Sequence, residues 1–557
     1  MPQKIPARLM LECIEPSRRG LSFCAVNEDA FADWLNNLPI TNTLKCYQLL
    51  IKANHELIEL RIPQILKLAL LNMLSQKNNV IGKQLQKQYL NKPTVLTKQD
   101  SLTCHYFEVL IAIQASAFRQ VLAESQKKFS SLFGARIKTV ITQAAGNLLY
   151  TQEKRLLNQL LRYQQPESGF WCSIHQIFQY CESLEIIDVE ITSPITTQEL
   201  TISLAYKRLV LLALFKTEQL PQTDINKVKI FVDDWAQRGQ LSPLQPTTDS
   251  TIKIDTYQDQ PFLNQHTSHG PGTHQFDITP IIDAIENTST KVIKLSLRTH
   301  LINCLRQNQA RQFKRLNVNK PKPYEIAVGF SAAHYFLRDQ QPLANLIPNA
   351  TTNSLSGHHF KQKSEFSFQQ EEASNIDIWD LTHHLDIPAP NKTTLPTIVS
   401  KEKSYPLLQA KMINISAGGF CFEVNHTGEH TIRSGDIILI RECASQTWQL
   451  ANIRWIKSYE TRLSMGVALL SPKPVPIVAL NSHRQQQSVQ LCRAILIHKN
   501  PFAKKSLLLP QIKVSSGQKI QFYQQKQLRE VYLREQLLAS GLFLQFNYQE
   551  IQSVEKT

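Results

Sequence analysis

Two arginines four residues apart, Arg311 and Arg315, lie where a helical sequence pattern gives way to a pattern of strands. If a helix continues through them, both side chains share one face; if it ends there, a short loop still lets both reach one ligand. The planar guanidinium group donates paired hydrogen bonds to phosphate oxygens and can stack on a purine ring. The pair therefore predicts a site for a phosphate-bearing ligand.

A second polar motif, Asn414-Ile415-Ser416-Ala417-Gly418-Gly419, comes directly before a strand-like segment, Phe420 to Val424. Short amide and hydroxyl side chains offer the donors and acceptors that the edge of a guanine needs, and glycine lets the backbone approach a ligand closely. Taken singly, each motif is weak. A chain with 61 lysines and arginines contains such arginine pairs by chance, and the second motif also suits a plain hairpin turn.

In this order, with strands following, the two motifs resemble those of the PilZ domain, which binds cyclic di-GMP. Three later segments resemble further strands of that family: Gly435 to Ile440, Asn452 to Ile456 and Met465 to Leu470. The resemblance implies an antiparallel β-barrel with a dinucleotide pocket. It places the phosphates and guanines against Arg311 and Arg315, with Asn414, Ser416 and Gly419 on the opposite wall. Asn414 follows Arg315 by 99 residues, whereas the family usually has one strand and a turn there.

The elements around these motifs predict a multidomain α + β protein. Apolar residues at three- and four-residue spacing, clearest in Ile137 to Tyr163, indicate a helical N-terminal half, and alternating patterns after Tyr324 indicate strands. The expected parts are a helical domain (1–240), a linker (241–278) with a short strand at Thr251 to Tyr257, a helical connector (279–310), a PilZ-like barrel (311–475) with an inserted loop at about 340–403, and a second small β domain (476–557). One interpretation of this last part is a degenerate PilZ-like domain.

Bulk properties restrict the choice of function further. The longest apolar run, Leu209 to Phe215, has seven residues, far too few for a membrane span, so we expect a cytoplasmic protein. Ten cysteines without a C-x-x-C pair indicate reduced thiols rather than a zinc site or a disulfide framework. A net charge of +16 indicates an anionic partner without identifying it.

No catalytic motif or phosphate-binding glycine loop is present, so we expect neither an enzyme nor a bound metal or cofactor. Seven histidines in loop-like sequence have spacings that could hold a metal, and we expect them to be surface residues instead: His266, His269, His274, His358, His359, His383 and His384. The functional prediction is a cyclic di-GMP receptor that signals through a partner-binding helical half. The alternative is a degenerate PilZ scaffold that binds protein or nucleic acid without the dinucleotide, although no nucleic-acid-binding motif supports that form.

Overall fold

In the computed structural model the chain forms two compact units, one helical and one built of β-barrels. The main division lies between residues 310 and 311, and the short segment Glu218–Pro221 groups with the β-barrel unit. Each unit is described by itself. The structure describes residues 13–90, 92, 96–128, 134–191, 200–244, 251–263, 272–306, 316–341, 343–346, 382–385, 405–416, 418–425, 432–459, 462–482, 489–498, 504–510, 514–525, 527–539 and 543–551. Arg311, Arg315 and most of the predicted inserted loop lie outside these residues.

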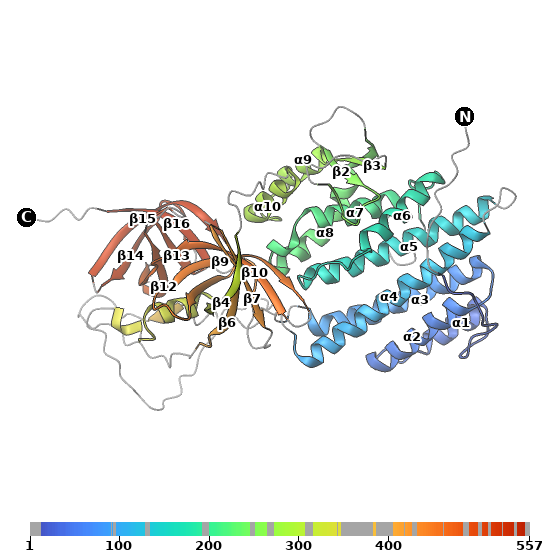
Figure 1. The fold of residues 1–557 in the computed structure, drawn as a ribbon, viewed down its shortest axis with the longest axis horizontal. Helices are drawn as coiled ribbons and strands as arrows, with labels where there is room; N and C mark the ends of the chain where they lie inside the picture. Colours follow the sequence, from blue (N-terminus) through green and yellow to red (C-terminus); the bar gives the residue numbers. More distant parts are fainter. Residues whose placement is uncertain are drawn as a thin grey trace, which may run out of the picture. The chain divides into compact units, whose positions relative to one another are not determined.

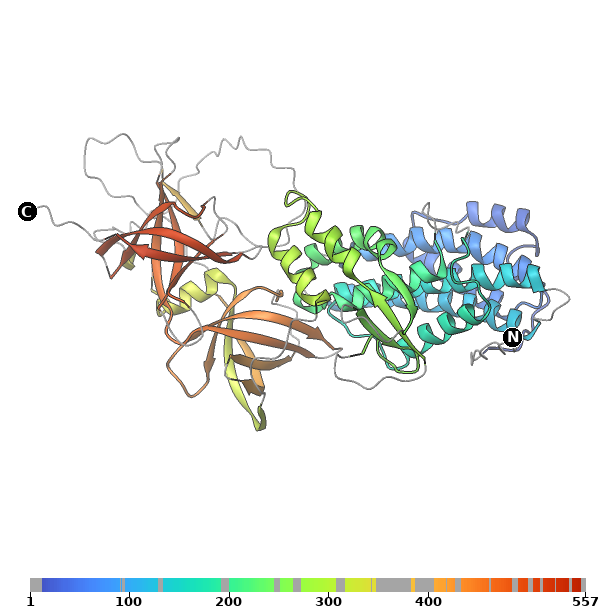
Figure 2. The ribbon, with the colours of Figure 1, turned by 90° about the horizontal axis from the view of Figure 1, so that it is seen from above.

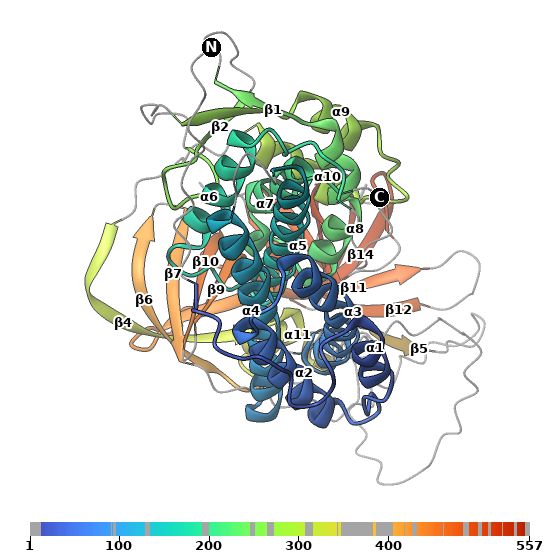
Figure 3. The same ribbon diagram turned by 90° about the vertical axis from the view of Figure 1, so that its right-hand side faces the viewer.

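The predicted helical N-terminal half is confirmed. Its helices are α1 (Glu28–Asn36), α2 (Thr43–Glu59), α3 (Gln64–Tyr89), α4 (Lys98–Lys127), α5 (Gly134–Leu161), α6 (Phe170–Ser183), α7 (Ile202–Leu214) and α8 (Gln222–Arg238), with a short 3-10 turn, η1 (Thr217–Gln219), between the last two. Long helices α3, α4 and α5 lie side by side with α4 in the middle (Figure 1). Viewed along this unit, α1 and α2 lie at one end of the stack and α6 to α8 at the other (Figure 3).

Local sequence explains where several of these helices begin. The side chain of Thr97 accepts a hydrogen bond from the backbone N–H of Asp100 and caps α4, and Thr201 caps α7 in the same way through Leu204. The apolar stripe predicted in α5 is buried, with Ile141 fully inaccessible to solvent. Burial of such stripes, rather than helix propensity, supplies most of the stability of the bundle.

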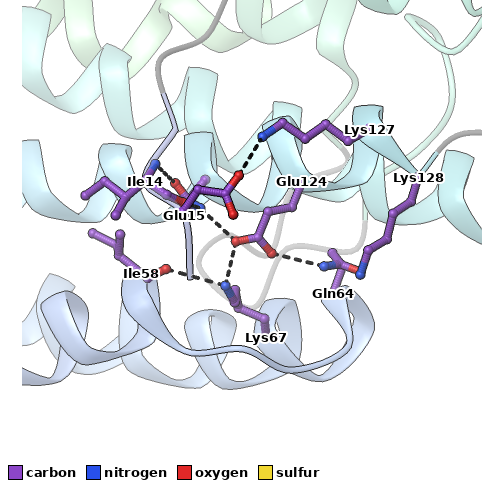
Figure 4. A network of polar contacts seen from close by, with 9 residues as sticks. Ile14, Glu15, Ile58, Gln64, Lys67, Glu124, Lys127 and Lys128 are labelled. Carbon is purple, nitrogen blue, oxygen red and sulfur yellow. Dashed lines mark hydrogen bonds and ion pairs between the residues drawn. The ribbon is translucent and has the colours of Figure 1, made fainter. Parts of the chain in front are cut away.

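The helical unit also contains a buried ion pair between α3 and α4 (Figure 4). The ammonium group of Lys67, which is 0% exposed, lies 2.8 Å from Glu124 Oε1. Gln64 donates to the other oxygen of this carboxylate at 3.0 Å, and Gln120 donates to Oε1 at 2.7 Å. Burial lowers the pKa of Lys67, while the bond to Glu124 opposes that shift.

Gln120 extends this network to the N-terminal segment. Its side chain accepts from the backbone N–H of Ile14 at 3.0 Å and donates to the Ile14 carbonyl at 2.6 Å. The Gln120 amide thereby binds both backbone groups of Ile14, as the backbone of a neighbouring β-strand would. The carboxylate of Glu124 consequently holds three parts of the unit together: α3, α4 and the chain that precedes α1.

The prediction of a linker at 241–278 is wrong for much of that segment. Three antiparallel strands form a sheet in the order β1-β3-β2: β1 (Gln240–Pro243), β2 (Thr251–Asp255) and β3 (Thr273–Asp277). Polar contacts attach the region to α6. The Asp259 carboxylate accepts from three backbone N–H groups at the start of α6, those of Gly169, Trp171 and Cys172, at 2.6 to 3.1 Å. A polar composition does not distinguish these strands from a linker, because the strands depend on distant contacts.

One histidine prediction also needs correction. His274, in β3, is buried rather than on the surface, and its Nε2 lies 2.9 Å from Oε1 of Glu182 on α6. His383 and His384 lie in a strand whose side chains are not described, and the other four histidines lie outside the described residues. Among the described residues, no three His, Cys, Asp or Glu side chains come together as metal ligands. Helices α9 (Thr279–Asn287) and α10 (Leu295–Leu305) complete the unit, within the segment 279–310 that was predicted as a helical connector.

The predicted barrel and second β domain are both confirmed. The first barrel closes through β4 (Leu316–Val328), β6 (Leu408–Ser416), β7 (Gly419–Asn425), β8 (Ile437–Glu442), β9 (Gln449–Ser458) and β10 (Arg462–Ser471). The second contains β11 (Val475–Ser482), β12 (Val489–Ile497), β13 (Ser506–Pro510), β14 (Lys519–Gln524), β15 (Gln527–Ala539) and β16 (Phe543–Glu550), and the pairing of β11 with β12 closes its ring.

Between β4 and β6 the chain forms α11 (Phe330–Leu337), a 3-10 turn η2 (Leu343–Leu346) and the short strand β5 (Thr382–Leu385), which pairs with β12. Helix α11 lies between the orange strands of the first barrel and the red strands of the second (Figure 2). Among the described residues, no helix combines the length and apolar character needed to cross a membrane.

Candidate functional site

Strand pairing brings the two polar motifs to one end of the first barrel. Leu316, the first residue of β4, pairs with Ile415 of β6, and Asn317 pairs with Asn414. Arg315, the residue before Leu316, lies outside the described residues, as does Arg311. The chain therefore enters β4 directly beside the Asn414 to Ser416 segment, although 99 residues separate the two motifs in sequence.

The long insertion is attached to the other end of the same strand pair. Ile326, near the end of β4, pairs with Leu408, the first residue of β6, and α11 and the insertion connect these ends. At about 3.3 Å per residue, the seven residues from Leu408 to Ile415 separate the insertion's attachment from the motif end by roughly 20 Å. The insertion thus leaves the pairing between the two motif-bearing ends intact.

A β-bulge decides which way the polar side chains face. Met412 pairs with Phe422, which is 0% exposed in the barrel interior, but Asn414 pairs with Cys421 on the opposite face of β7. The extra residue, Ile413, shifts the alternation by one position. Without this bulge Asn414 and Ser416 would point into the apolar interior. With it, both lie on the outer face of the barrel, where they are partly exposed.

The centre of this outer face consists of small residues, which we call the floor: Gly419, Cys421, Gly466 and Ala468. Two rows of cross-strand neighbours run over β6, β7, β10 and β9: Asn414, Cys421, Gly466 and Trp455 in one, and Ser416, Gly419, Ala468 and Asn452 in the other. A Cβ atom on Gly419 would lie 1.9 Å from the Val467 carbonyl oxygen. The missing side chain of Gly419 is therefore required by the neighbouring strand, which is a different reason from the close approach of ligand that the sequence suggested.

Two further residues border this floor, and sequence reasoning did not assign them to the site. The indole ring of Trp455 lies over Gly466, since a Cβ there would be 2.0 Å from Nε1 of the ring. Arg454 is exposed at a second register shift, between Gly466 and Val467 of β10. The sequence placed both residues in a strand, but their position opposite Asn414 depends on strand pairing and two bulges. An aromatic ring and a guanidinium group beside a flat floor can bind a base and a phosphate.

Asp436, in the turn before β8, is a buried carboxyl group of the first barrel, and β8 begins beside the end of β4 from which the insertion leaves. It is 4% exposed and accepts a hydrogen bond from the backbone N–H of Arg433 at 2.8 Å. Burial raises the pKa of Asp436 to about 7, against the opposing effects of that bond and of the Arg433 charge. The group is therefore protonated in the folded barrel at mildly acid pH.

This carboxyl group predicts a pH dependence of barrel stability. Below the ordinary aspartate pKa, the carboxyl group is protonated in both the folded and the unfolded protein. As the pH rises, it ionises first in the unfolded protein, because its pKa there is lower. The free energy of unfolding therefore falls until the pH passes about 7. We expect the barrel of the wild type to lose roughly 3 kcal/mol between pH 5 and pH 8, at about 1.4 kcal/mol per pH unit over the two units below pH 7. Asp436→Asn should remove most of this slope in urea unfolding. An identical slope in both proteins would contradict the assignment.

Comparison with known proteins agrees with this geometry. Residues 29–247 match the family model described as the N-terminal domain of the cyclic-di-GMP receptor FimW, and residues 252–476 match its middle PilZ domain. A curated protein from Pseudomonas aeruginosa, the cyclic-di-GMP receptor FimW, is 21% identical over 586 aligned residues, covering 98% of this chain and 94% of that protein. No solved structure matches. The first barrel is therefore a PilZ domain, and the chain as a whole is similar to the cyclic-di-GMP receptor FimW.

Proposed function

We propose that the chain is a receptor that binds cyclic di-GMP on the outer face of its first barrel, at the end where β4 begins and β6 finishes. The pairing of Leu316 with Ile415 carries this proposal. Arg315 directly precedes Leu316 in the sequence, and in this proposal its side chain binds the ligand together with Asn414 and Ser416. The name of the Pseudomonas aeruginosa relative supports the choice of ligand.

Each group at this end has a distinct role in the proposed complex. Arg311 and Arg315 bind the phosphates through charge-assisted hydrogen bonds and cover a guanine with their planar groups. Asn414 and Ser416 bind the polar edges of the ligand from β6, and the small-residue floor lets it lie flat against the strands. Trp455 offers a stacking surface at the far side of the floor. These contacts bind and orient a ligand, and no bond is broken or formed.

Signal transmission is proposed through the junction of the two units. The division of the chain between residues 310 and 311 falls at the first arginine of the motif. A ligand that binds Arg311 and Arg315 therefore binds to the segment that connects the helical unit to the barrel. A ligand changes a conformational equilibrium only if it binds the two conformations of the protein with unequal affinity. In this proposal the junction differs between the two conformations, and so the affinity differs too. The helical unit is proposed to present the resulting change to a protein partner.

Titration calorimetry of the full chain with cyclic di-GMP tests the receptor function. We expect a dissociation constant of about 10 μM or lower, with the linear dinucleotide pGpG binding more weakly because it lacks the preorganised ring. Absence of heat at tens of micromolar would overturn the proposal. Tight, steeply salt-dependent binding of DNA or RNA in the same protein would instead favour a scaffold that has lost the dinucleotide.

A further inference from the structure

The two barrels share one strand order. Numbering the six strands of each barrel along the chain, the first ring is β4-β8-β9-β10-β7-β6 and the second is β11-β14-β15-β16-β13-β12, which is 1-4-5-6-3-2 in both. Strands β12, β13 and β16 of the second barrel therefore correspond to β6, β7 and β10 of the first. In the first barrel, the outer face of these strands carries Asn414, Ser416 and the small-residue floor.

The corresponding outer face of the second barrel is apolar and buried. Ile495 of β12 pairs with Leu508 of β13, and both are 0% exposed. Their neighbours along the strands, such as Leu496 and Leu507, fill the barrel interior. Since side chains alternate between the two faces of a strand, Ile495 and Leu508 point outward. Something outside the barrel must cover them.

That cover is α11, which continues directly from β4 of the first barrel. Phe330, Ala333 and Phe336 of α11 share one apolar cluster with Ile495 and Leu508. The cluster also includes residues of the first barrel, namely Ile437, Leu439 and Leu450. Helix α11 thus packs between the two barrels, on the face of the second that matches the proposed ligand face of the first.

Polar contacts fix α11 in this position. His334, which is 0% exposed, donates through Nε2 to the Ile477 carbonyl oxygen of β11 at 2.9 Å. Arg493, on the outer face of β12, donates to the Ser331 hydroxyl at 3.4 Å. A buried histidine bonded to a backbone carbonyl holds the helix in a specific register, because any shift would leave both polar groups without these partners.

The sequence of the second barrel also lacks the polar motifs of the first. Residues 498–505, between β12 and β13, read His-Lys-Asn-Pro-Phe-Ala-Lys-Lys and contain no N-x-S-x-x-G pattern. The residues before β11 belong to the end of β10 and a short turn, and they contain no R-x-x-x-R pair. Both the sequence and the packing of this barrel thus differ from those of a dinucleotide site.

We propose that the second barrel is a PilZ-type barrel whose nucleotide-type face has become a docking surface for α11 of the same chain. Each chain then has one dinucleotide-binding face, on the first barrel, and the second barrel holds the helix that extends from β4. The number of ligand faces rests on the proposed receptor function, whereas the docking of α11 does not.

A pair of substitutions tests the docking without ligand. Leu508→Asp puts a charge on the covered outer face, and Tyr532→Asp puts the same charge on β15 at a side chain that is 42% exposed. Because Leu508 points out of the barrel, its replacement is harmful only if another element covers it. We expect Leu508→Asp to lower the melting temperature of the barrel unit by roughly 6 °C or more and Tyr532→Asp by about 2 °C or less. Equal small shifts would overturn the docking of α11.

Equilibrium dialysis of the full chain with labelled cyclic di-GMP tests the number of ligand faces. In the double variant Asn414→Ala with Ser416→Ala, we expect the loss of all saturable binding in the concentration range where the wild type saturates. Retention of about half the wild-type sites would show that the second barrel binds the dinucleotide and would overturn the single-face inference. If the wild type binds none, the receptor function fails, and the Leu508 comparison still decides whether α11 is docked.

Discussion

Replacing Arg315 by alanine is expected to weaken the binding of cyclic di-GMP at least about 100-fold. A charged group that donates to phosphate contributes about 1.5 to 3 kcal/mol per hydrogen bond, and a bidentate arginine makes two such bonds. Arg315 directly precedes Leu316, whose partner is Ile415, and in the proposed site it supplies a cation that acts together with Asn414 and Ser416. Titration calorimetry of the full chain measures the change.

Lys320 provides a matched control for the loss of charge. It is exposed in β4, five residues beyond Arg315, and its removal lowers the net charge by the same amount. We expect Lys320→Ala to change the affinity by less than about threefold, because a solvated charge outside the site contributes only screened attraction. Equal losses in the two variants would indicate general electrostatic attraction rather than a site at Arg315.

Glu124→Gln is expected to lower the free energy of unfolding of the helical unit by about 3 to 5 kcal/mol, because it leaves the buried ammonium group of Lys67 without its counter-charge. The Glu124 carboxylate is bonded to Lys67, Gln64 and Gln120, so the change also disturbs the attachment of the N-terminal segment. Urea unfolding followed by circular dichroism at 222 nm, where the helical unit dominates, measures the loss.

Two further variants identify the cause of that loss. Adding Lys67→Met to Glu124→Gln removes the unpaired charge, and we expect it to recover most of the stability, since buried pairs can often be replaced by apolar groups at little cost. The exposed pair of Lys504 and Glu535, 3.6 Å apart in the β unit, is the surface comparison. Glu535→Gln should change stability by less than about 0.5 kcal/mol. No recovery in the double variant would contradict the buried-charge explanation.

The sequence predicted the elements that have strong local patterns. The stripe in α5 has helical spacing and is long enough to exclude a strand, and the alternation of Phe420, Phe422 and Val424 defines β7. The same local reasoning failed at 241–278. There the strands are four or five residues long and are stabilised by distant groups, such as the α6 backbone that binds Asp259. A polar composition does not reveal such contacts.

The candidate site was predictable as a set of residues but not as a surface. Residue types identified the two motifs, and resemblance to a family supplied their order. The proximity of Leu316 to Ile415 depends on the register of two strands separated by the insertion, which local sequence does not determine. The bulge at Ile413 and the position of Trp455 opposite Asn414 depend on pairing in the same way.

The position of the insertion changes how the 99-residue gap should be interpreted. From sequence alone the gap is a departure from the single strand and turn that the PilZ family usually has there. In the barrel, the insertion leaves from the end of β4 and returns at Leu408, away from the Leu316 end. A long insertion there has little entropic cost for the pairing at the other end, because loop closure depends only weakly on length. The two halves of the site are therefore predicted to act as one.

A double-mutant cycle with Arg315→Ala and Ser416→Ala, measured as the affinity of the full chain for cyclic di-GMP, tests this central claim most directly. If both side chains bind one ligand at one end of the barrel, their effects should be non-additive, with a coupling free energy of about 0.5 kcal/mol or more. Effects that add within about 0.3 kcal/mol, or an affinity that neither substitution changes, would contradict a shared site.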